Sequence, residues 1–430
     1  MMFYKETIFK ETPIGKIPKE WEAVKLSDIS ESFISGGTPS TKEPKYWNGN
    51  IPWIRSIHLS KYYINENSIE QYITKEGLEN SASNIVPKGN LIIATRVGIG
   101  KSAVNLIDVA INQDLTGVVI DKLRAEPFYV VWYLLSPKTI RTLESFTRGT
   151  TIKGMAQDHI KNLLIPLPSL SEQQKIAEVL STVDEAIQKT DEVIAKTERL
   201  KKGLMQELLT RGIGHKEFKD TEIGRIPKEW EVISLENGSL RIRTGPFGSQ
   251  LKKSELSESG VKVYTQENIL KNDFSLGNLY VSYDKFKKLK TMEVELGDVL
   301  LTIRGSTGYS AVFPEGAERG IIHTNLAYIR VKRSLLLPEY LSLLINDYPL
   351  VKSQIITLSS ATTLGALYAK HIKKIKIPLP PLQEQQKIVN ILSNTNKKLE
   401  IERNEKAKLE RIKQGLMDLL LTGKIRIKVI

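Results

Sequence analysis

The chain has 430 residues, 40% of them hydrophobic and 26% charged, which is typical of a globular protein with about two to four domains. It contains no cysteine, which excludes disulfides, thiolate zinc sites, iron–sulfur clusters and cysteine nucleophiles. The net charge is +13, and most of the basic excess lies after residue 215. Such a balance favours a polyanionic partner, for example nucleic acid.

Membrane and metal sites are not expected from the sequence. The longest apolar run, residues 128–135, is far shorter than a bilayer span, and the first residues contain no apolar signal core. Only five histidines occur, and they are scattered along the chain. We therefore expect a cytoplasmic protein that has no membrane partner and no metal site.

One unit of about 210 residues occurs twice along the chain. The segment IGKIPKEWEAVKL at 14–26 returns as IGRIPKEWEVISL at 223–235. IPLPSLSEQQKI at 165–176 and GLMQELLT at 203–210 return as IPLPPLQEQQKI and GLMDLLLT, both 212 residues later. The interiors, roughly 30–90 and 239–296, barely align. This pattern predicts one scaffold that presents two different recognition surfaces.

The first part of each unit is rich in short β-strand patterns separated by Gly, Pro, Ser and Asn. We predict a short helix, opened by proline, at 127–136 and again at 338–347. The tryptophan of each IPKEW segment, Trp21 and Trp230, is expected to anchor the core. The strongest strand predictions are LIIATRV at 91–97, TGVVID at 116–121, VLLTIRG at 299–305 and NLAYIRV at 325–331.

Each unit ends in a predicted long helix, 170–210 and 382–421, without proline and with one glycine each. Ser171 and Gln383 are the nearest candidates for the N-caps. A helix of about 40 residues would be about 60 Å long. The apolar stripe along such a helix predicts that it packs against a partner helix, and the expected partner is the long helix of the other copy. The stripe residues expected to pack against a helix or a partner are Ile176, Leu180, Ile187, Leu204, Ile388, Leu392 and Leu416.

Catalytic signatures are absent from the sequence, and we assign no catalytic residue. GIGKS at 98–102 lacks the first glycine of a phosphate-binding loop and is better interpreted as a β-turn with a basic tip. His159 and His371 are equivalent in the two copies and are expected to pack or form hydrogen bonds. The divergent loops combine glycine with groups suited to phosphates and base edges. The candidate DNA-binding residues are Thr38, Ser40, Lys42, Arg55, Arg96, Lys101, Arg243, Thr244, Gln250, Lys252, Lys253 and Arg304.

These doubled motifs carry a family resemblance. With doubled IPKEW, IPLP-x-L-x-EQQKI and GLM-x-x-LLT, and with loop openings GGTPS and TGPFGSQLKKSE, the chain resembles the specificity subunit of Type I restriction–modification systems over nearly its full length. The resemblance implies an α+β fold in which two globular α/β target-recognition domains are separated by two long antiparallel helices, a coiled coil with pseudo-two-fold symmetry. It places the domains at 1–164 and 214–376, and the conserved helices at 165–213 and 377–430.

The resemblance also implies a non-catalytic subunit that binds double-stranded DNA, each domain reading one half of a bipartite, asymmetric site. The implied partners are two methylation subunits, which dock on the spacer helices, and restriction or translocation subunits. S-adenosylmethionine, ATP and magnesium would be bound by those partners, and this chain would hold no cofactor.

Two other functions stay open at this point. A self-sufficient DNA methyltransferase or nuclease would need motifs that the sequence lacks, and turnover by the purified chain would reveal one. A non-specific nucleic-acid-binding coiled-coil scaffold would need no divergence between the loops of the two copies.

Overall fold

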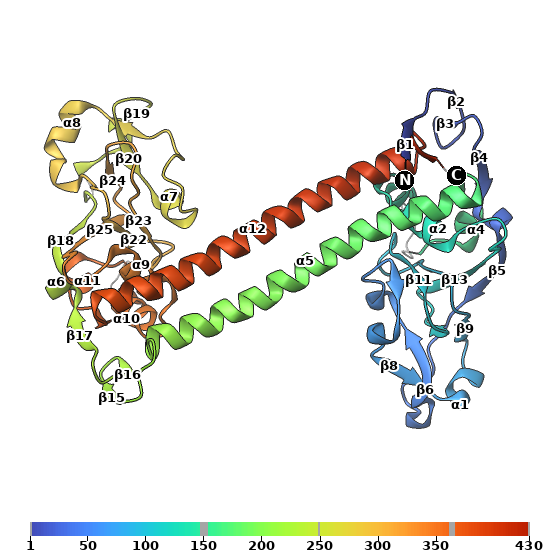
Figure 1. Ribbon diagram of the computed structural model, residues 1–430, viewed down its shortest axis with the longest axis horizontal. Helices are drawn as coiled ribbons and strands as arrows, with labels where there is room; N and C mark the ends of the chain where they lie inside the picture. The colour runs from blue at the N-terminus through green and yellow to red at the C-terminus, as the bar shows by residue number, and fades with distance from the viewer. Residues whose placement is uncertain (1, 147–153, 248–249, 361–365, 429–430) are drawn as a thin grey trace. The chain divides into compact units, whose positions relative to one another are not determined.

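The computed structural model describes residues 2–146, 154–247, 250–360 and 366–428 (Figure 1). Residues 150–153 and 362–365 of the repeated segments, and Gly248 and Ser249 of the divergent loop, lie outside this range. The contacts divide the chain into two compact units, the first made of 1–192 with 404–430 and the second of 193–403. Helices α5 (Leu170–Thr210) and α12 (Leu382–Leu420) each have residues in both units, and both were predicted within one residue.

The first unit contains a five-stranded sheet of order β5-β13-β10-β11-β7 and a four-stranded sheet of order β8-β6-β12-β9. Strands β6 and β12 are parallel, whereas β5, β13, β10 and β11 are antiparallel neighbours. The strands are β5 (Ser30–Ser35), β6 (Trp47–Ile54), β7 (Tyr63–Ile64), β8 (Gln71–Ile73), β9 (Asn84–Val86), β10 (Leu91–Ala94), β11 (Ser102–Asn105), β12 (Val109–Ile111) and β13 (Leu115–Ile120). The helices are α1 (Lys75–Glu79), α2 (Pro127–Leu134), α3 (Pro137–Ser145) and α4 (Gln157–Lys161).

The second unit repeats the central strand order of both sheets, β18-β25-β22-β23 and β19-β21-β20-β24, without counterparts of the edge strands β7 and β9 and with β19 added. Its parallel pair, β20 and β24, corresponds to β6 and β12. The strands are β18 (Ser239–Thr244), β19 (Leu256–Ser257), β20 (Val261–Tyr264), β21 (Tyr280–Val281), β22 (Val299–Thr302), β23 (Ser310–Val312), β24 (Gly320–Ile322) and β25 (Leu326–Val331). The helices are α6 (Leu235–Gly238), α7 (Gln266–Leu270), α8 (Tyr283–Lys288), α9 (Pro338–Asp347), α10 (Pro349–Ser360) and α11 (Ala369–Ile372). The four predicted strands and the two proline-opened helices are confirmed.

The repeated motifs contact each other within each unit. In the first, β14 (Leu164–Leu167), from IPLP, pairs antiparallel with β4 (Glu22–Lys25), which follows IPKEW. In the second, β26 (Lys376–Leu379) pairs in the same way with β17 (Glu231–Ser234). Trp21 and Trp230 are almost fully buried, as predicted. The near-identity of these segments in the two copies therefore reflects one structural joint that is built twice.

The EQQ motif ties each long helix to its globular core. Trp21 Nε1 donates to Glu172 Oε2 at 3.2 Å, and Trp230 Nε1 donates to Glu384 Oε2 at 3.0 Å. The next residue, Gln173, donates to the Pro168 carbonyl, as Gln385 does to the carbonyl of Pro380. Buried polar groups need such partners, so the motif fixes how each helix leaves its domain.

The N-cap predictions were wrong by two residues in each helix. Helix α5 begins at Leu170, and the Ser169 hydroxyl accepts the Glu172 amide, so Ser169 caps it and Ser171 lies inside the first turn. Helix α12 begins at Leu382, and the carbonyl of Pro381 accepts the amides of Glu384 and Gln385. Gln383 is therefore also inside its helix, because proline fixes the chain direction directly before it.

The two ends of the chain meet in the first unit. Strand β1 (Met2–Lys5) pairs antiparallel with β27 (Ile425–Lys428). Arg426 from β27 binds both carboxylate oxygens of Glu172, at 2.7 and 2.8 Å, and also contacts Glu6 at 2.9 Å. In the second unit the chain is continuous at the equivalent place, and His215 Nε2 lies 2.9 Å from Glu384 instead. The hairpin of β15 (Phe218–Thr221) and β16 (Gly224–Pro227) follows directly.

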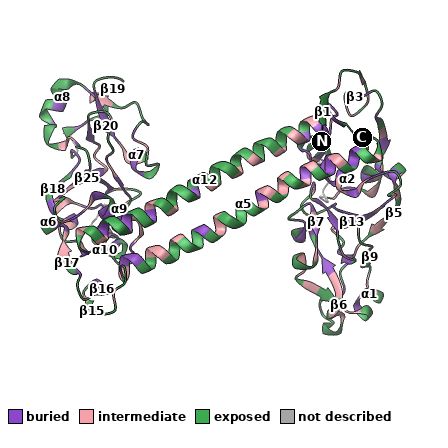
Figure 2. Cartoon of the chain, viewed as in Figure 1, coloured by how far each residue is buried: buried purple, intermediate pink, exposed green. Residues whose placement is uncertain are grey.

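Within each unit, the two long helices are antiparallel, as predicted. In the first unit, Asp184 pairs with Lys413, and Asp191 pairs with Lys406 at 2.6 Å. In the second, Glu198 pairs with Arg403 at 2.6 Å. Figure 2 shows burial concentrated near the helix ends, where the helices meet the globular parts of the units. No helix in the described ranges is long and apolar enough to cross a membrane.

The apolar stripe packs mainly on the globular cores. Ile176 and Leu180 lie in the core of the first unit, and Ile388 and Leu392 lie in that of the second. Ile187 is buried, whereas Leu204 and Leu416 are partly buried, each at the far end of its helix. Leu200 and Ile412, two further apolar residues of the long helices, are 58% and 51% exposed. The stripe is therefore interrupted between the ends of the helices.

Removing the carboxylate that Trp21 and Arg426 share should destabilise the first unit. Glu172→Ala leaves a buried guanidinium without its bidentate partner, which should cost about 3–5 kcal/mol of unfolding free energy. Urea unfolding followed by tryptophan fluorescence measures it. Glu178→Ala, which removes an exposed ion pair with Lys175 on the same helix, should change stability by less than about 0.5 kcal/mol. Equal effects of the two variants would contradict this role of Glu172.

Candidate nucleic-acid interface

Several predicted residues of the first unit gather where strands of its sheets end. Gly37 donates its amide to the Ile111 carbonyl at 3.0 Å, so the divergent loop crosses the end of β12. The hydroxyl of Thr38, one residue later, donates to Gln113 Oε1. We call the loop 36–40 together with residues 55, 96 and 112–114 the first loop edge. It is the place where the divergent loop meets the ends of β6, β10 and β12.

Backbone hydrogen bonds bring the other strands to this edge. The Asn112 amide donates to the Ile54 carbonyl at 3.1 Å, which places Arg55 beside β12. The Thr95 amide donates to the Asp114 carbonyl at 2.8 Å, which places Arg96 beside the same turn. Arg55 and Arg96 are both exposed. Two guanidinium groups and the amide of Gln113 are thus available on one edge.

The second unit builds an equivalent edge with different side chains. Gly245 donates to the Leu326 carbonyl at 2.7 Å, and the His323 amide donates to the Tyr264 carbonyl at 2.8 Å. The Ile303 amide donates to the Asn325 carbonyl at 2.9 Å, so Arg304 occupies the place of Arg96. We call residues 245–247, 265–266, 304 and 323–325 the second loop edge.

The same kind of local hydrogen bond, from a backbone amide to a side chain three residues later, supports both edges. The Arg55 amide donates to His58 Nδ1 at 2.9 Å, and the Thr265 amide donates to Asn268 Oδ1 at 2.8 Å. Burial lowers the pKa of His58, and the neutral ring can accept at Nδ1. Burial also lowers the pKa of His323, so this residue of the second edge is uncharged at neutral pH.

Arg304 lies over one aromatic ring, which is itself stacked on a second. Its guanidinium carbon lies 5.6 Å from the ring centroid of Phe247, a cation–π arrangement. The Phe247 ring stacks on Tyr368 with centroids 6.0 Å apart. Gln266 donates to the Arg304 carbonyl, and Arg304 Nε is buried without a hydrogen-bond partner among the described residues. The first unit has Thr38 and Ala156 where the second has the two rings, so Arg96 lacks this support.

The chemistry of the two edges suits base edges and phosphates. Arginine can contact guanine O6 and N7 with two hydrogen bonds, and Gln and Asn side chains pair with adenine in a similar way. The neutral imidazole of His323 and the hydroxyl of Thr324 can donate or accept. The backbone arrangements of the two edges are alike, whereas their side chains differ apart from the shared arginines Arg96 and Arg304. Two domains that bind different DNA sequences require this geometry.

Other predicted residues lie near the edges or elsewhere in the units. Ser40 and Lys42 are exposed on the first divergent loop, where Trp47 Nε1 donates to the Ser40 carbonyl at 3.1 Å. Gln250 accepts the Phe247 amide at 2.9 Å and so shapes the second loop. Lys252 and Lys253 are exposed beyond it.

Arg243, Thr244 and Lys101 complete the predicted set. Arg243 is exposed on β18, whereas Thr244 is only 8% exposed and faces the sheet interior. Lys101 lies after a glycine turn, as expected for GIGKS, since its amide donates to the Gly98 carbonyl. It lines a groove against α5 together with Asp184 and is not part of the first loop edge.

Sequence reasoning missed Gln113, Gln266, His323, Thr324 and Tyr368. Gln113, His323 and Thr324 lie in short turns that follow apolar strands, whereas Gln266 begins α7 directly after β20. The available signal was the mismatch of INQD at 111–114 with IHTN at 322–325 inside otherwise similar flanks. His159 stacks on Phe146, and His371 accepts the Tyr368 amide, so both histidines pack or bond as expected.

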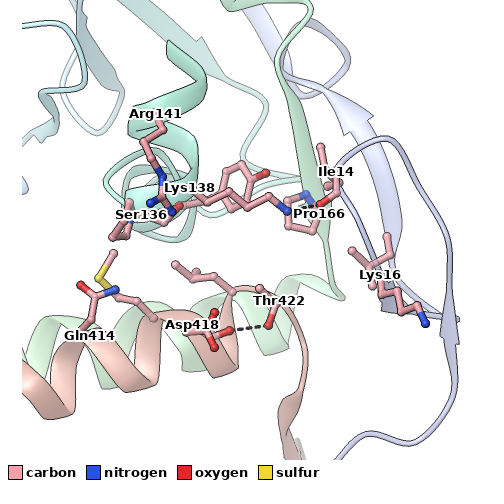
Figure 3. A pocket seen from close by; sticks show the side chains of 14 residues that line it. Ile14, Lys16, Ser136, Lys138, Arg141, Pro166, Gln414, Asp418 and Thr422 are labelled. Atoms are coloured by element: carbon pink, nitrogen blue, oxygen red, sulfur yellow. Dashed lines mark hydrogen bonds between the residues drawn. The ribbon is translucent and has the colours of Figure 1, made fainter. Parts of the chain in front are cut away.

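A separate pocket of about 150 Å³ lies in the first unit where α12 ends (Figure 3). Lys138 donates to the carbonyl of Ile14, and Thr422 donates to that of Asp418. The Asp418 carboxylate pairs with Lys424 at 2.9 Å. The first contact joins α3 to the segment around Ile14, and the other two are local to the end of α12. All three segments line the pocket, so it is part of the packing of the first unit. Among the described residues, no group of three His, Asp or Glu side chains could hold a metal.

Comparison with known proteins identifies the family. The model of the Type I restriction modification DNA specificity domain matches residues 18–199 and 227–411, once in each copy. The chain belongs to this family. It is a DNA specificity subunit with two target-recognition domains, and catalysis in such a system resides in partner subunits.

Relatives extend over the whole chain of this specificity subunit. The Type I restriction enzyme MjaVIII specificity subunit of Methanocaldococcus jannaschii is 30% identical over 100% of this chain and 98% of its own. The MjaIX specificity subunit of the same organism is 29% identical over 98% of both. The crystal structure of a Type I restriction–modification S subunit from M. genitalium shares the fold, with a TM-score of 0.57 at 15% identity, covering 97% and 100% of the two chains.

A single methyl group at either crossing glycine should disturb one loop edge. A β-carbon at Gly245 would overlap the carbonyl oxygen of His323, and one at Gly36 would overlap the carbonyls of Ile111 and Asn112. Gly36→Ala and Gly245→Ala should each cost about 1–3 kcal/mol and weaken DNA binding by the affected edge. Thermal unfolding and DNA titration measure the two effects.

The matched control for both variants is Gly415→Ala in α12. A β-carbon there meets nothing within 4 Å, so alanine should stabilise the helix by about 0.5–1 kcal/mol. Unchanged stability and DNA binding in Gly36→Ala and Gly245→Ala would refute the close crossing of the loops.

Proposed function

We propose that each loop edge reads one half of a bipartite, asymmetric sequence in double-stranded DNA. The observation that carries this proposal is that two equivalent frames present different side chains around a shared arginine, Arg96 or Arg304. The proposed contacts include the predicted residues of the two divergent loops, with Lys101, Arg243 and Thr244 as nearby or supporting positions. In this proposal the target-recognition domains span 1–164 and 214–376.

The two long helices, within 165–213 and 377–430, are proposed to act as the spacer between the half-site readers. They consist of 41 and 39 unbroken residues, or about 60 Å of helix each. We also propose that they dock two methylation subunits, and that restriction subunits join that complex. S-adenosylmethionine, ATP and magnesium would then act on those partners, and the complex would work in the cytoplasm.

The half-site proposal is tested by methylome sequencing of cells that carry this chain with its methylation subunits. The parent should give one bipartite motif, and Arg96→Ala and Arg304→Ala should each relax one position in a different half. Losing a bidentate arginine–guanine contact should cost about 1–3 kcal/mol at that position. A parent without a bipartite motif would overturn the function, and changes in both halves from one variant would overturn the assignment of one edge to one half.

The exposed apolar positions Leu200 and Ile412 are proposed as docking points for the two methylation subunits. They are equivalent in the two copies, and each is more than half exposed. Leu200→Asp and Ile412→Asp should each release one of two methylation subunits, since a buried unpaired charge costs several kcal/mol. Mass measurement of the purified complex reports the stoichiometry.

Two controls separate docking from folding. Lys202→Asp adds an acidic group beside Leu200 without removing apolar surface, and it should keep both methylation subunits. Leu416→Asp, at a partly buried position, should lower the stability of the chain itself. Complexes of unchanged stoichiometry for both Leu200→Asp and Ile412→Asp would exclude these positions as docking points.

A further inference from the structure

A basic groove runs along the second unit beside its loop edge. It has a volume of about 660 Å³ and lies between β18 and α11. Its charged lining residues are Glu236, Arg241, Arg243, Lys370 and Lys373. Four cations and one carboxylate therefore face a single groove.

Three of the four cations have no acidic partner among the residues that the structure describes. Lys373 pairs with Glu236 at 2.9 Å, which uses the single carboxylate among the described lining residues. For Arg241, Arg243 and Lys370, no ion pair forms within the described residues, and all three are exposed. Next to them, burial and then the charges of Lys370 and Lys374 lower the pKa of His371. The groove is thus a concentrated, uncompensated positive field.

The first unit lacks this feature at the equivalent positions. The repeat places Ser32 and Ile34 of β5 where β18 has Arg241 and Arg243. It places Asp158 of α4 where α11 has Lys370. Because the strands and helices correspond, the difference lies in the side chains and not in the frame. It accounts for part of the charge difference between the two halves of the sequence.

The groove is next to the second loop edge along both of its elements. Strand β18 leads directly into Gly245 and Phe247, and α11 directly follows Tyr368, whose ring stacks on Phe247. A ligand that reaches the supported guanidinium of Arg304 would therefore also pass the unpaired cations. Backbone phosphates are the anions that accompany any base edge presented there.

We propose that this groove binds the DNA phosphate backbone and that the second unit thereby supplies a salt-dependent anchor that the first unit lacks. The inference rests on the proposed reading of DNA by the loop edges. Its contacts are independent of sequence, so it assigns to Arg241, Arg243 and Lys370 a role in affinity and not in base choice. The first unit would then depend more on its base contacts for the binding of its half-site.

The test compares the parent with the triple variant Arg241→Ala, Arg243→Ala, Lys370→Ala, using the full chain in complex with its methylation subunits. The probe is a 30-base-pair duplex of random sequence, titrated at several salt concentrations. The slope of log affinity against log salt should fall by about 2–3, at about 0.9 per lost phosphate contact. The affinity at low salt should fall by roughly ten-fold or more. The methylated motif should remain the same in both halves.

Two matched variants define the alternatives. Lys216→Ala, Arg225→Ala, Lys228→Ala removes the same charge from the same unit outside the groove and should leave the slope nearly unchanged. Arg241→Lys, Arg243→Lys, Lys370→Arg keeps the charges and should behave like the parent, because phosphate contact needs charge more than fork geometry. Circular dichroism melting establishes that each variant is folded.

The outcomes separate this inference from the proposed function. A folded alanine variant with the parent slope would overturn the phosphate groove while the bipartite motif of the parent still supports DNA reading. A motif altered in one half would show that the groove reads bases and would also overturn the inference. A parent complex without a bipartite motif would instead reject the function on which the inference rests.

Discussion

A glutamate in the first turn of each long helix, Glu172 fully buried and Glu384 12% exposed, is the constraint on which the structure depends. Glu172 and Glu384 accept the indole N–H of Trp21 and Trp230, and these rings fill the junction between globular core and helix. Carboxylates at helix N-termini are favoured by the helix dipole, and the indole uses its single donor on them. Because each helix is fixed at its start, the loop edges and the helices keep one geometry within each unit.

The two copies stabilise the negative charge of this glutamate with different partners. Glu172 is 2% exposed and is neutralised by Arg426 from the end of the chain. Glu384 accepts a hydrogen bond from the amide of Ile213 and lies within hydrogen-bond distance of His215 Nε2. Both groups come from the segment directly after α5. The same fold therefore accepts a different partner for the glutamate. In the first unit the partner comes from a distant segment of the sequence, and in the second it comes from the segment directly after α5. The loop edges differ in a comparable way. Arg55 and Thr265 occupy equivalent positions, and the backbone amide of each donates to a side chain three residues later.

Much of the fold could be predicted because the chain contains its own comparison. Near-identical segments marked the joint between β4 and β14, and the loss of proline marked both long helices. The exposure of Leu200 and Ile412 was not predictable, because a periodic pattern does not say which apolar residue meets a neighbour. The loop edges required tertiary structure: Thr38 and Gln113 are 75 residues apart, and only the crossing of β12 brings them together.

The pairing of β1 with β27 has a consequence for the order in which the protein matures on the ribosome. Leu420, Leu421 and Ile427 belong to the core that also contains Trp21 and Trp132. Translation delivers these residues after 193–403, so the unit whose synthesis begins first cannot complete its interior until they have been made. Residues 193–403 have no such dependence and can finish folding earlier. A chain that stops before residue 420 would therefore expose an unfinished core in its first unit.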